Sequence, residues 1–191
     1  MEIYLVRHTT PKIGKGICYG QLNLDVTDNF LDEVKEIKKQ LPEKESFIYT
    51  SPLIRCYKLA CQLGNPISLQ NQLKEVNFGT WENTTWDAIP SKEIDPWMAD
   101  FVTKKPPKGE SYLEVAARVI DFFEKLTQQS TNTPIIIASH AGPMRAFLAH
   151  ILHIPLKDSF SIKLAYGHVI KLEYSNENFK VISGLERSIS V

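Results

Sequence analysis

The sequence predicts an α/β protein, a three-layer sandwich with a mostly parallel central sheet and an antiparallel edge. Short apolar runs rich in β-branched residues, at 3–6 and 135–138, are typical of buried strands. Segments with apolar residues at helical spacing, at 30–41 and 113–123, lie between such runs. Because strands alternate with helices along most of the chain, helices are expected to cover both faces of one sheet.

The individual elements follow from the same patterns and from the residues that interrupt them. We expect strands over 3–6, 47–49, 67–69 and 135–138, helices over 30–41, through 59–63, from 110 to before 134 and through 144–148, and a hairpin of 169–174 with 179–182. Pro42 and Gly64 mark helix ends, and Asn176-Glu177-Asn178 supplies the hairpin turn. The hairpin provides the antiparallel edge.

One region departs from the alternation. Residues 73–97 are rich in aromatic side chains but have no clear periodicity, and the turn-forming segment 104–109 follows them. We expect the stretch at about 73–109 to form a lid or side wall of a single domain that spans residues 1–191.

Composition limits the functional class. The 191 residues are 43% hydrophobic, and 22 Lys and Arg balance 22 Asp and Glu, so no overall charge attracts nucleic acid or an anionic membrane. No run approaches the roughly 18 apolar residues that span a bilayer. The three cysteines, Cys18, Cys56 and Cys61, have neither metal-ligand spacing nor an even count. These features predict a cytoplasmic protein without nucleic-acid or membrane partners.

Polar side chains follow three of the predicted strands directly. Arg7 and His8 end the first, Ser51 and nearby Arg55 follow the second, and His140 follows the strand at 135–138. The carboxyl ends of parallel strands meet at one edge, where ligands of α/β proteins bind. Arginine matches phosphate geometry, and histidine serves as nucleophile or donor according to its protonation. The set predicts a phosphate site.

Five motifs in one order make the pattern specific. They are Leu5-Val6-Arg7-His8, Ser51-Pro52-Leu53-Ile54-Arg55, Glu75-Val76-Asn77-Phe78-Gly79-Thr80-Trp81-Glu82, Gly109-Glu110-Ser111 and Ser139-His140-Ala141-Gly142-Pro143-Met144-Arg145. The chain thereby resembles the histidine phosphatase superfamily, which implies a phosphoglycerate mutase-like fold. The motifs extend from residue 5 to residue 145, so the resemblance covers most of the chain.

The resemblance implies a mechanism. His8 would attack phosphorus and form a phosphohistidine, while Arg7, Arg55 and His140 hold the phosphoryl oxygens. Glu75 stands at the family's acid position and would protonate the leaving oxygen, with Glu82 and Glu110 as alternative acids. Neither a metal nor another cofactor is implied.

Two positions depart from the common family pattern. Thr9 follows Arg7-His8 where glycine is usual, and Asn83 follows Trp81-Glu82 where glycine is frequent. The first loop lacks the asparagine that many members carry, so Gln21 or Thr9 is a candidate substitute for its phosphate contact. Gly142 is a further candidate for substrate binding.

The predicted activity is hydrolysis of a small phosphorylated metabolite. Cys18-Tyr19-Gly20-Gln21 and the short chain resemble the α-ribazole phosphatase branch, which implies α-ribazole 5'-phosphate of cobalamin biosynthesis as substrate. A broad-specificity sugar-phosphate or nucleotide phosphatase is the alternative. A phosphoglycerate mutase ranks lower because 73–109 is short, and a non-catalytic binding protein ranks lower because His8, Arg55 and His140 are all present. A homodimer stays open.

Overall fold

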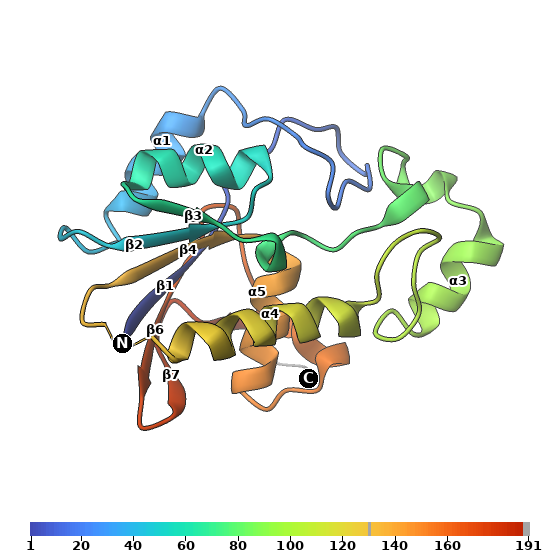
Figure 1. The fold of residues 1–191 in the computed structure, drawn as a ribbon. Helices are drawn as coiled ribbons and strands as arrows, with labels where there is room; N and C mark the ends of the chain where they lie inside the picture. Colours follow the sequence, from blue (N-terminus) through green and yellow to red (C-terminus); the bar gives the residue numbers. More distant parts are fainter. Residues whose placement is uncertain (130, 189–191) are drawn as a thin grey trace.

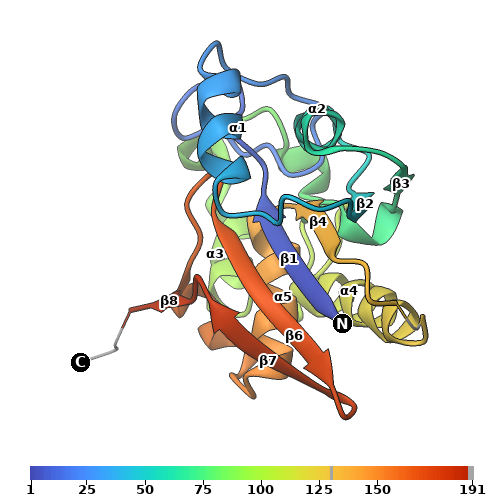
Figure 2. The ribbon, with the colours of Figure 1, turned by 90° about the vertical axis from the view of Figure 1, so that its left-hand side faces the viewer.

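The computed structural model describes residues 1–129 and 131–188 and contains a six-stranded central sheet (Figure 1). The strands are β1 (Glu2–Arg7), β2 (Phe47–Thr50), β3 (Ile67–Leu69), β4 (Ile135–Ser139), β6 (Val169–Ser175) and β7 (Asn178–Ser183). Their order across the sheet is β3-β2-β4-β1-β6-β7, so β1 lies in the interior (Figure 2). All four strands and the hairpin that the sequence predicts are present.

Strand direction divides the sheet into two parts. β3, β2, β4 and β1 are parallel, β6 pairs antiparallel with β1, and β7 pairs antiparallel with β6. The sheet is therefore mostly parallel with an antiparallel edge, which confirms the predicted fold class. The chain moves outward from β1 to β2 and β3 and then returns to place β4 between β2 and β1, a change of direction that opens a crevice at the strand ends.

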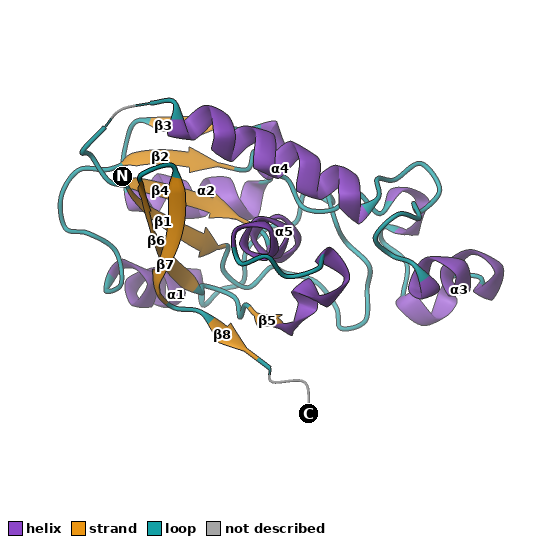
Figure 3. Ribbon diagram, turned by 90° about the horizontal axis from the view of Figure 1, so that it is seen from below, coloured by secondary structure: helices purple, strands orange, loops and turns teal. Residues whose placement is uncertain are grey.

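Alternation along the strands creates the three layers. In β1 and β4 the odd-numbered apolar residues pack on one face of the sheet and the even-numbered ones on the other. Helices α1 (Phe30–Lys38) and α2 (Ile54–Leu63) cover the even-numbered face, while α4 (Tyr112–Thr127) and α5 (Ala141–Ile151) cover the opposite face (Figures 1 and 3). Both faces of the sheet are therefore covered by helices and buried, as the continuous apolar runs predict.

Two helix boundaries differ from the predicted ones. α1 ends at Lys38 instead of Leu41, because the last residues form tight turns in which Gln40 and Leu41 donate to carbonyls three residues earlier. α4 begins at Tyr112 instead of Glu110, because Ser111 caps it: the Ser111 hydroxyl accepts from the Glu114 amide, and the Glu114 carboxylate accepts from the Ser111 amide.

Residues 73–109, called the aromatic segment below, are more ordered than the sequence predicts. They contain the short 3₁₀ turns η2 (Gly79–Trp81) and η3 (Trp86–Ala88) and the helix α3 (Ser91–Ala99), which extends away from the sheet (Figure 3). The expectation of an irregular stretch was wrong for α3. This helix carries no fully buried residue and contains Pro96, so it presents little of the periodic apolar pattern that marks a core helix.

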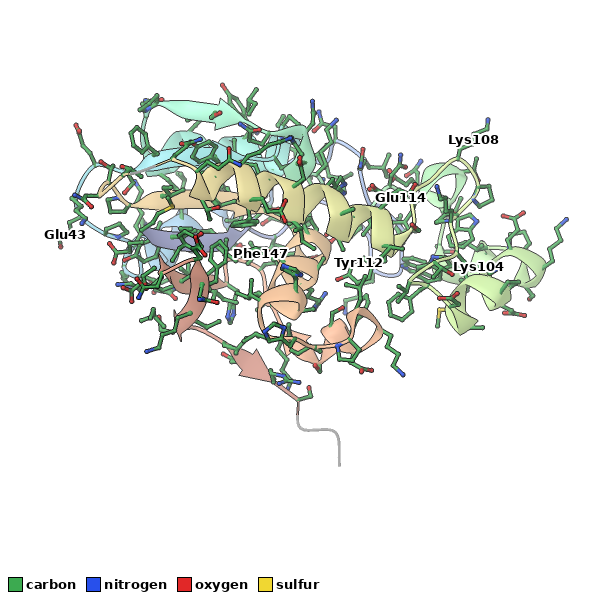
Figure 4. The ribbon with its side chains drawn as sticks, turned by 60° about the horizontal axis from the view of Figure 1, so that its bottom comes forward. Glu43, Lys104, Lys108, Tyr112, Glu114 and Phe147 are labelled. Carbon is green, nitrogen blue, oxygen red and sulfur yellow. The ribbon has the colours of Figure 1, made fainter. Side chains whose placement is uncertain are left out.

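Aromatic side chains connect this segment to the rest of the protein. Trp97 contacts Phe78, Trp81, Trp86 and Phe101 with ring centroids 5.5 to 6.1 Å apart. Phe101 continues the chain of contacts to Tyr112 at the start of α4, the end nearest Lys104 and Lys108 (Figure 4). The aromatic enrichment of the sequence thus builds a small satellite core beside the sheet.

Three of the remaining elements lie after α5. They are η4 (Leu156–Ser161) and a two-stranded ribbon of β5 (Ile162–Lys163) with β8 (Glu186–Arg187), none of which the sequence patterns indicate. The short η1 (Asn71–Leu73) precedes the aromatic segment. Within the described residues, no helix combines the length and apolar character that crossing a bilayer requires.

Phe147 of α5 is part of the core between the sheet and helices α4 and α5. It is 1% exposed and stacks on Phe123 at 3.4 Å between ring centroids. We expect Phe147→Ala to lower the free energy of unfolding by about 3 to 5 kcal/mol, because it leaves a cavity. Leu31→Ala on α1 is the control: Leu31 is 58% exposed, so its loss is expected to be about 0.5 kcal/mol or less. Urea denaturation of both variants tests this, and equal losses would contradict it.

Candidate active site

Strand register brings the predicted site residues together. Arg7 of β1 lies opposite Ser139 of β4, and Thr50 of β2 lies opposite Ala138. The residues that follow each strand, among them His8 and His140, therefore emerge at one level of the same edge. Their imidazole rings meet edge to face with centroids 5.0 Å apart.

Hydrogen bonds assign the tautomer of His8. Its Nδ1 lies 2.6 Å from the carbonyl oxygen of Thr9, which can only accept, so Nδ1 carries the hydrogen. Nε2 then carries the lone pair, which accepts a hydrogen bond from Nε of Arg55 at 3.3 Å. A neutral imidazole with its lone pair toward a cationic cluster is the form that can attack an electrophile.

The surroundings keep His8 neutral. Burial disfavours the imidazolium and lowers the pKa of His8 well below its usual 6.5, and the charges of Arg55 and Arg7 lower that pKa further. The backbone bond to Thr9 raises the pKa, but this effect is smaller than those of burial and of the charge of Arg55. His8 is 1% exposed, so water does little to counter the charge of the two guanidinium groups.

Arg55 is fully buried and is fixed by the first loop. Its two terminal nitrogens donate to the carbonyl oxygens of Leu22 and Gly20, both at 2.7 Å, and its Nε faces His8. The first turn of α2 supplies the residue, and no carboxylate neutralises it among the described residues. A buried guanidinium bonded only to neutral acceptors favours an anion beside it.

His140 lies between β4 and α5 and is bonded to groups from two other elements. Its Nε2 contacts the hydroxyl of Ser51 at 2.8 Å and the thiol of Cys56 at 3.4 Å. Burial lowers the pKa of His140 well below the usual value, and the charge of Arg55 adds to the effect. Before phosphate binds, this ring is therefore neutral near pH 7, and the two negative charges of phosphate would favour its protonation to a charged donor.

Two tyrosines lie over the cluster. The ring of Tyr166 is 4.0 Å from the guanidinium carbon of Arg7 and 5.5 Å from the His8 ring, and its hydroxyl contacts that of Tyr19 at 2.9 Å. Tyr19 also covers Arg55, at 5.5 Å. A phosphoryl group must displace part of this cover to reach His8.

Glu75 follows η1, and its carboxylate lies against the N-terminus of α5, the helix that begins directly after His140. Its carboxylate accepts from the amides of Gly142 and Val76 at 3.1 and 3.0 Å. A side chain at position 142 would collide with it, because an added Cβ would come within 2.3 Å of Oε1. The candidate role of Gly142 thus becomes one of contact with the acid, which its missing side chain permits.

The two alternative acids are engaged elsewhere. Glu82 accepts from the amides of Gln21 and Phe78, and Glu110 forms an ion pair with Arg118 at 2.9 Å. The side-chain amide of Gln21 donates to the backbone carbonyl of Glu75 at 3.0 Å, so it stabilises the loop that carries Glu75 instead of facing His8. Glu75 also accepts from amides, but it lines the pocket beside Arg7, where Glu82 does not, and it forms no ion pair within residues 1–129 and 131–188, unlike Glu110; this geometry favours Glu75 as the proton donor.

Thr9 is fully buried beside the nucleophile. Its carbonyl fixes the His8 tautomer, while its hydroxyl has no hydrogen-bond partner in the described part of the chain. Nε of Arg7 is unpartnered in the same way. Buried donors without partners are uncommon and indicate a site that a ligand completes.

A pocket of about 220 Å³ adjoins the cluster between α5 and the aromatic segment. Arg7, Glu75 and Gly142 contribute at the reactive side. Its other walls are mainly aromatic, formed by Tyr19, Phe78, Trp86, Trp97, Phe101, Tyr112 and Phe160. In residues 1–129 and 131–188, no three His, Cys, Asp or Glu side chains group as a metal site would require.

Fold and site together define a phosphate-handling α/β enzyme, and comparison with known families specifies it. The model of the histidine phosphatase superfamily, branch 1, matches residues 3–184, so the chain belongs to this superfamily. The resemblance carried by the five sequence motifs is confirmed. Relatives over most of the chain are named as phosphatases, and another is named as a phosphoglycerate mutase; the superfamily and these phosphatases place the chain among the phosphatases.

Individual relatives point to different substrates. Phosphoserine phosphatase 1 of Hydrogenobacter thermophilus is 26% identical over 184 residues, which are 91% of this chain and 87% of that protein. Glucosyl-3-phosphoglycerate phosphatase of Mycolicibacterium vanbaalenii is 26% identical over 81% of this chain and 76% of its own. The crystal structure of α-ribazole phosphatase from Shigella flexneri superposes with a TM-score of 0.89 at 20% identity, covering 100% and 99% of the two chains, and shows the shared fold.

Some site residues had no recognisable signal in the sequence. Tyr166 follows no motif, and Cys56 and Arg118 are ordinary helical positions until the fold places them beside His140 and Glu75. Tyr19 and Arg145 stand inside quoted motifs but had no assigned role. Contacts between distant segments, such as Tyr19 with Tyr166, are set by loop conformation and leave no periodic pattern.

The two buried histidines predict how stability changes with pH. In the unfolded chain each histidine has a pKa of about 6.5, whereas both pKa values are far lower in the folded protein. The unfolded state therefore binds more protons as pH falls below that value, and the free energy of unfolding decreases, by up to about 1.4 kcal/mol per pH unit for each group.

We expect His8→Gln and His140→Gln to reduce this pH dependence between about pH 7 and pH 5. His150→Gln is the control, because His150 is an exposed residue of α5. Urea denaturation at a series of pH values measures the slope. A slope that is the same in all four proteins would show that neither ring is held neutral by the fold.

Proposed function

We propose that the protein hydrolyses phosphomonoesters through a phosphohistidine formed at Nε2 of His8, without a metal ion. The observation that carries this proposal is the neutral His8, whose lone pair points toward the buried Arg55. Burial and the charge of this guanidinium keep the ring deprotonated, and each terminal nitrogen of Arg55 has a second N–H that can donate to a phosphoryl oxygen. The preferred substrate that we propose is α-ribazole 5'-phosphate, a small phosphorylated metabolite.

In the first step the lone pair of His8 Nε2 attacks phosphorus, and the bond from phosphorus to the ester oxygen breaks. Glu75 gives a proton to that oxygen, and the alcohol leaves. Arg7, Arg55 and His140 stabilise the charge on the remaining oxygens, where pre-positioned donors have their largest effect. The unpartnered Nε of Arg7 and hydroxyl of Thr9 are further donors for this group.

In the second step water attacks the phosphohistidine and Glu75 takes its proton. The bond from Nε2 to phosphorus breaks, inorganic phosphate is released and neutral His8 is regenerated. The depressed pKa of His8 supports this step, because burial and the two arginines favour the return of an uncharged ring. Protons and phosphoryl groups balance over the cycle without a co-reactant other than water.

The pocket supports an aromatic leaving group. Its walls are indole, phenol and phenyl rings, which stack favourably on a flat heterocycle such as the benzimidazole of α-ribazole. Phosphoserine and simple sugar phosphates are small and polar, and they would leave much of this apolar surface in contact with water. The aromatic wall therefore favours α-ribazole 5'-phosphate over phosphoserine and glucosyl-3-phosphoglycerate, the substrates in the names of the two relatives compared above.

The first test concerns the nucleophile. We expect His8→Ala to lower turnover by a factor of about 10³ or more, because no other group takes over the attack. The unmodified protein should also trap an acid-labile, base-stable phosphoprotein when quenched with a radiolabelled ester, and His8→Ala should not. His150→Ala is the control, since His150 is exposed on α5. Normal turnover by His8→Ala would refute the mechanism.

The second test concerns the substrate and the metal. Phosphate release is measured from α-ribazole 5'-phosphate, phosphoserine, 3-phosphoglycerate, sugar phosphates and nucleoside monophosphates, each with and without EDTA. We expect kcat/KM for α-ribazole 5'-phosphate to exceed the others by about 10-fold or more, and EDTA to have no effect. Similar values for all esters would indicate the broad-specificity alternative, and inhibition by EDTA would exclude metal-free chemistry.

A further inference from the structure

Arg145 lies on the wall of the pocket and takes no part in the mechanism above. It follows Ala141 and Gly142 by four and three residues on α5, so all three lie on one face of the helix, and all three line the pocket. Phe160 and Tyr112 flank it on neighbouring walls. The position is therefore on the leaving-group side of Glu75.

Two contacts fix the orientation of the Arg145 side chain. Its Nε donates to the carbonyl oxygen of Ile162 at 2.9 Å, and its guanidinium carbon lies 5.1 Å from the centre of the Phe160 ring. One edge of the planar group is thereby occupied. The fork of terminal N–H groups is held at a defined angle rather than free to rotate into solvent.

The terminal N–H groups of Arg145 have no protein acceptor within residues 1–129 and 131–188. The nearby carboxylates are engaged: Glu110 pairs with Arg118, and Glu75 accepts from Gly142. Burial lowers the pKa of Arg145 and the charge of Arg7 lowers it further, whereas Tyr112 and Glu75 act in the opposite direction. A partly desolvated guanidinium in an aromatic pocket is stabilised by an acceptor that a ligand brings.

We propose that Arg145 is a specificity-determining residue, which donates hydrogen bonds to an acceptor on the leaving group of the phosphoester. The inference rests on the proposed phosphatase activity and narrows its substrates to esters whose leaving group is flat and carries an acceptor beyond the ester oxygen. A carboxylate and an uncharged ring nitrogen or hydroxyl both provide that chemistry. The benzimidazole and ribose of α-ribazole are of the uncharged kind.

The experiment compares esters that differ in the acceptor alone. The kcat/KM values of 4-carboxyphenyl phosphate and α-ribazole 5'-phosphate are each divided by that of phenyl phosphate. The ratios are measured for the unmodified protein, Arg145→Met, Arg145→Lys and the control Arg187→Met. Arg187 is an exposed residue of β8 that does not line the pocket, so the control carries the same substitution outside the site.

Arg145→Met is expected to lower at least one ratio by about 10- to 100-fold, which corresponds to the loss of a charge-assisted hydrogen bond. Arg187→Met should leave both ratios unchanged. A loss confined to 4-carboxyphenyl phosphate, partly restored by Arg145→Lys, identifies a carboxylate as the acceptor. A loss for α-ribazole 5'-phosphate that lysine does not restore identifies an uncharged acceptor, because only the planar fork matches it.

A second measurement keeps this inference separate from the proposed hydrolysis. Trp86 and Trp97 line the pocket, so their fluorescence reports binding of the product alcohols 4-hydroxybenzoate, phenol and α-ribazole without any turnover. Arg145→Met should weaken 4-hydroxybenzoate or α-ribazole relative to phenol. Unchanged ratios in both assays, or equal losses for all three esters, would overturn the role of Arg145. Absence of turnover in the unmodified protein, with selective binding retained, would overturn the proposed function alone.

Discussion

The register of β1 against β4, with β2 on the far side of β4, is the constraint on which the rest of the site depends. It sets Arg7 opposite Ser139 and Thr50 opposite Ala138, so the residues that follow the three strands emerge together. Apolar layers on both faces hold this register, because a slip of one residue would exchange the two faces of every strand. The reactive groups are thus positioned by the most buried part of the molecule.

Arg55, a cation with no ion-pair partner in the part of the chain that the structure describes, dominates the electrostatics at this edge. Arg55 is bonded to two backbone carbonyls and to His8, and its charge acts together with burial, the larger effect, to lower the pKa of both histidine rings and keep them neutral. An arriving phosphate would compensate Arg55 and Arg7 at once, and it would favour protonation of His140 while His8 attacks. One guanidinium therefore links binding of the anion to the protonation state that the chemistry needs. The Tyr19 and Tyr166 pair adds a cover that the substrate has to displace.

The phosphate end and the leaving-group end of the site are built by different parts of the chain. Strand ends supply the first, whereas α5 and the aromatic segment with α3 supply the second. Relatives with different named substrates share the superfamily to which this chain belongs. The residues that separate such substrates are therefore expected on the aromatic wall and at Arg145, where no step of phosphoryl transfer constrains the side chain.

The sequence by itself determined the layer architecture, the strands, the position of His8 and the superfamily, because these follow from local periodicity and from short motifs with fixed spacing. Helix α3, the exact starts and ends of α1 and α4, and the pair β5 and β8 needed the tertiary structure, since caps and satellite packing override the pattern there. The environment of Glu75, Glu82 and Glu110 also required the fold. The motif already favours Glu75 but leaves Glu82 and Glu110 as alternatives, and their partners Gly142, Gln21 and Arg118, brought from distant segments, add the distinction.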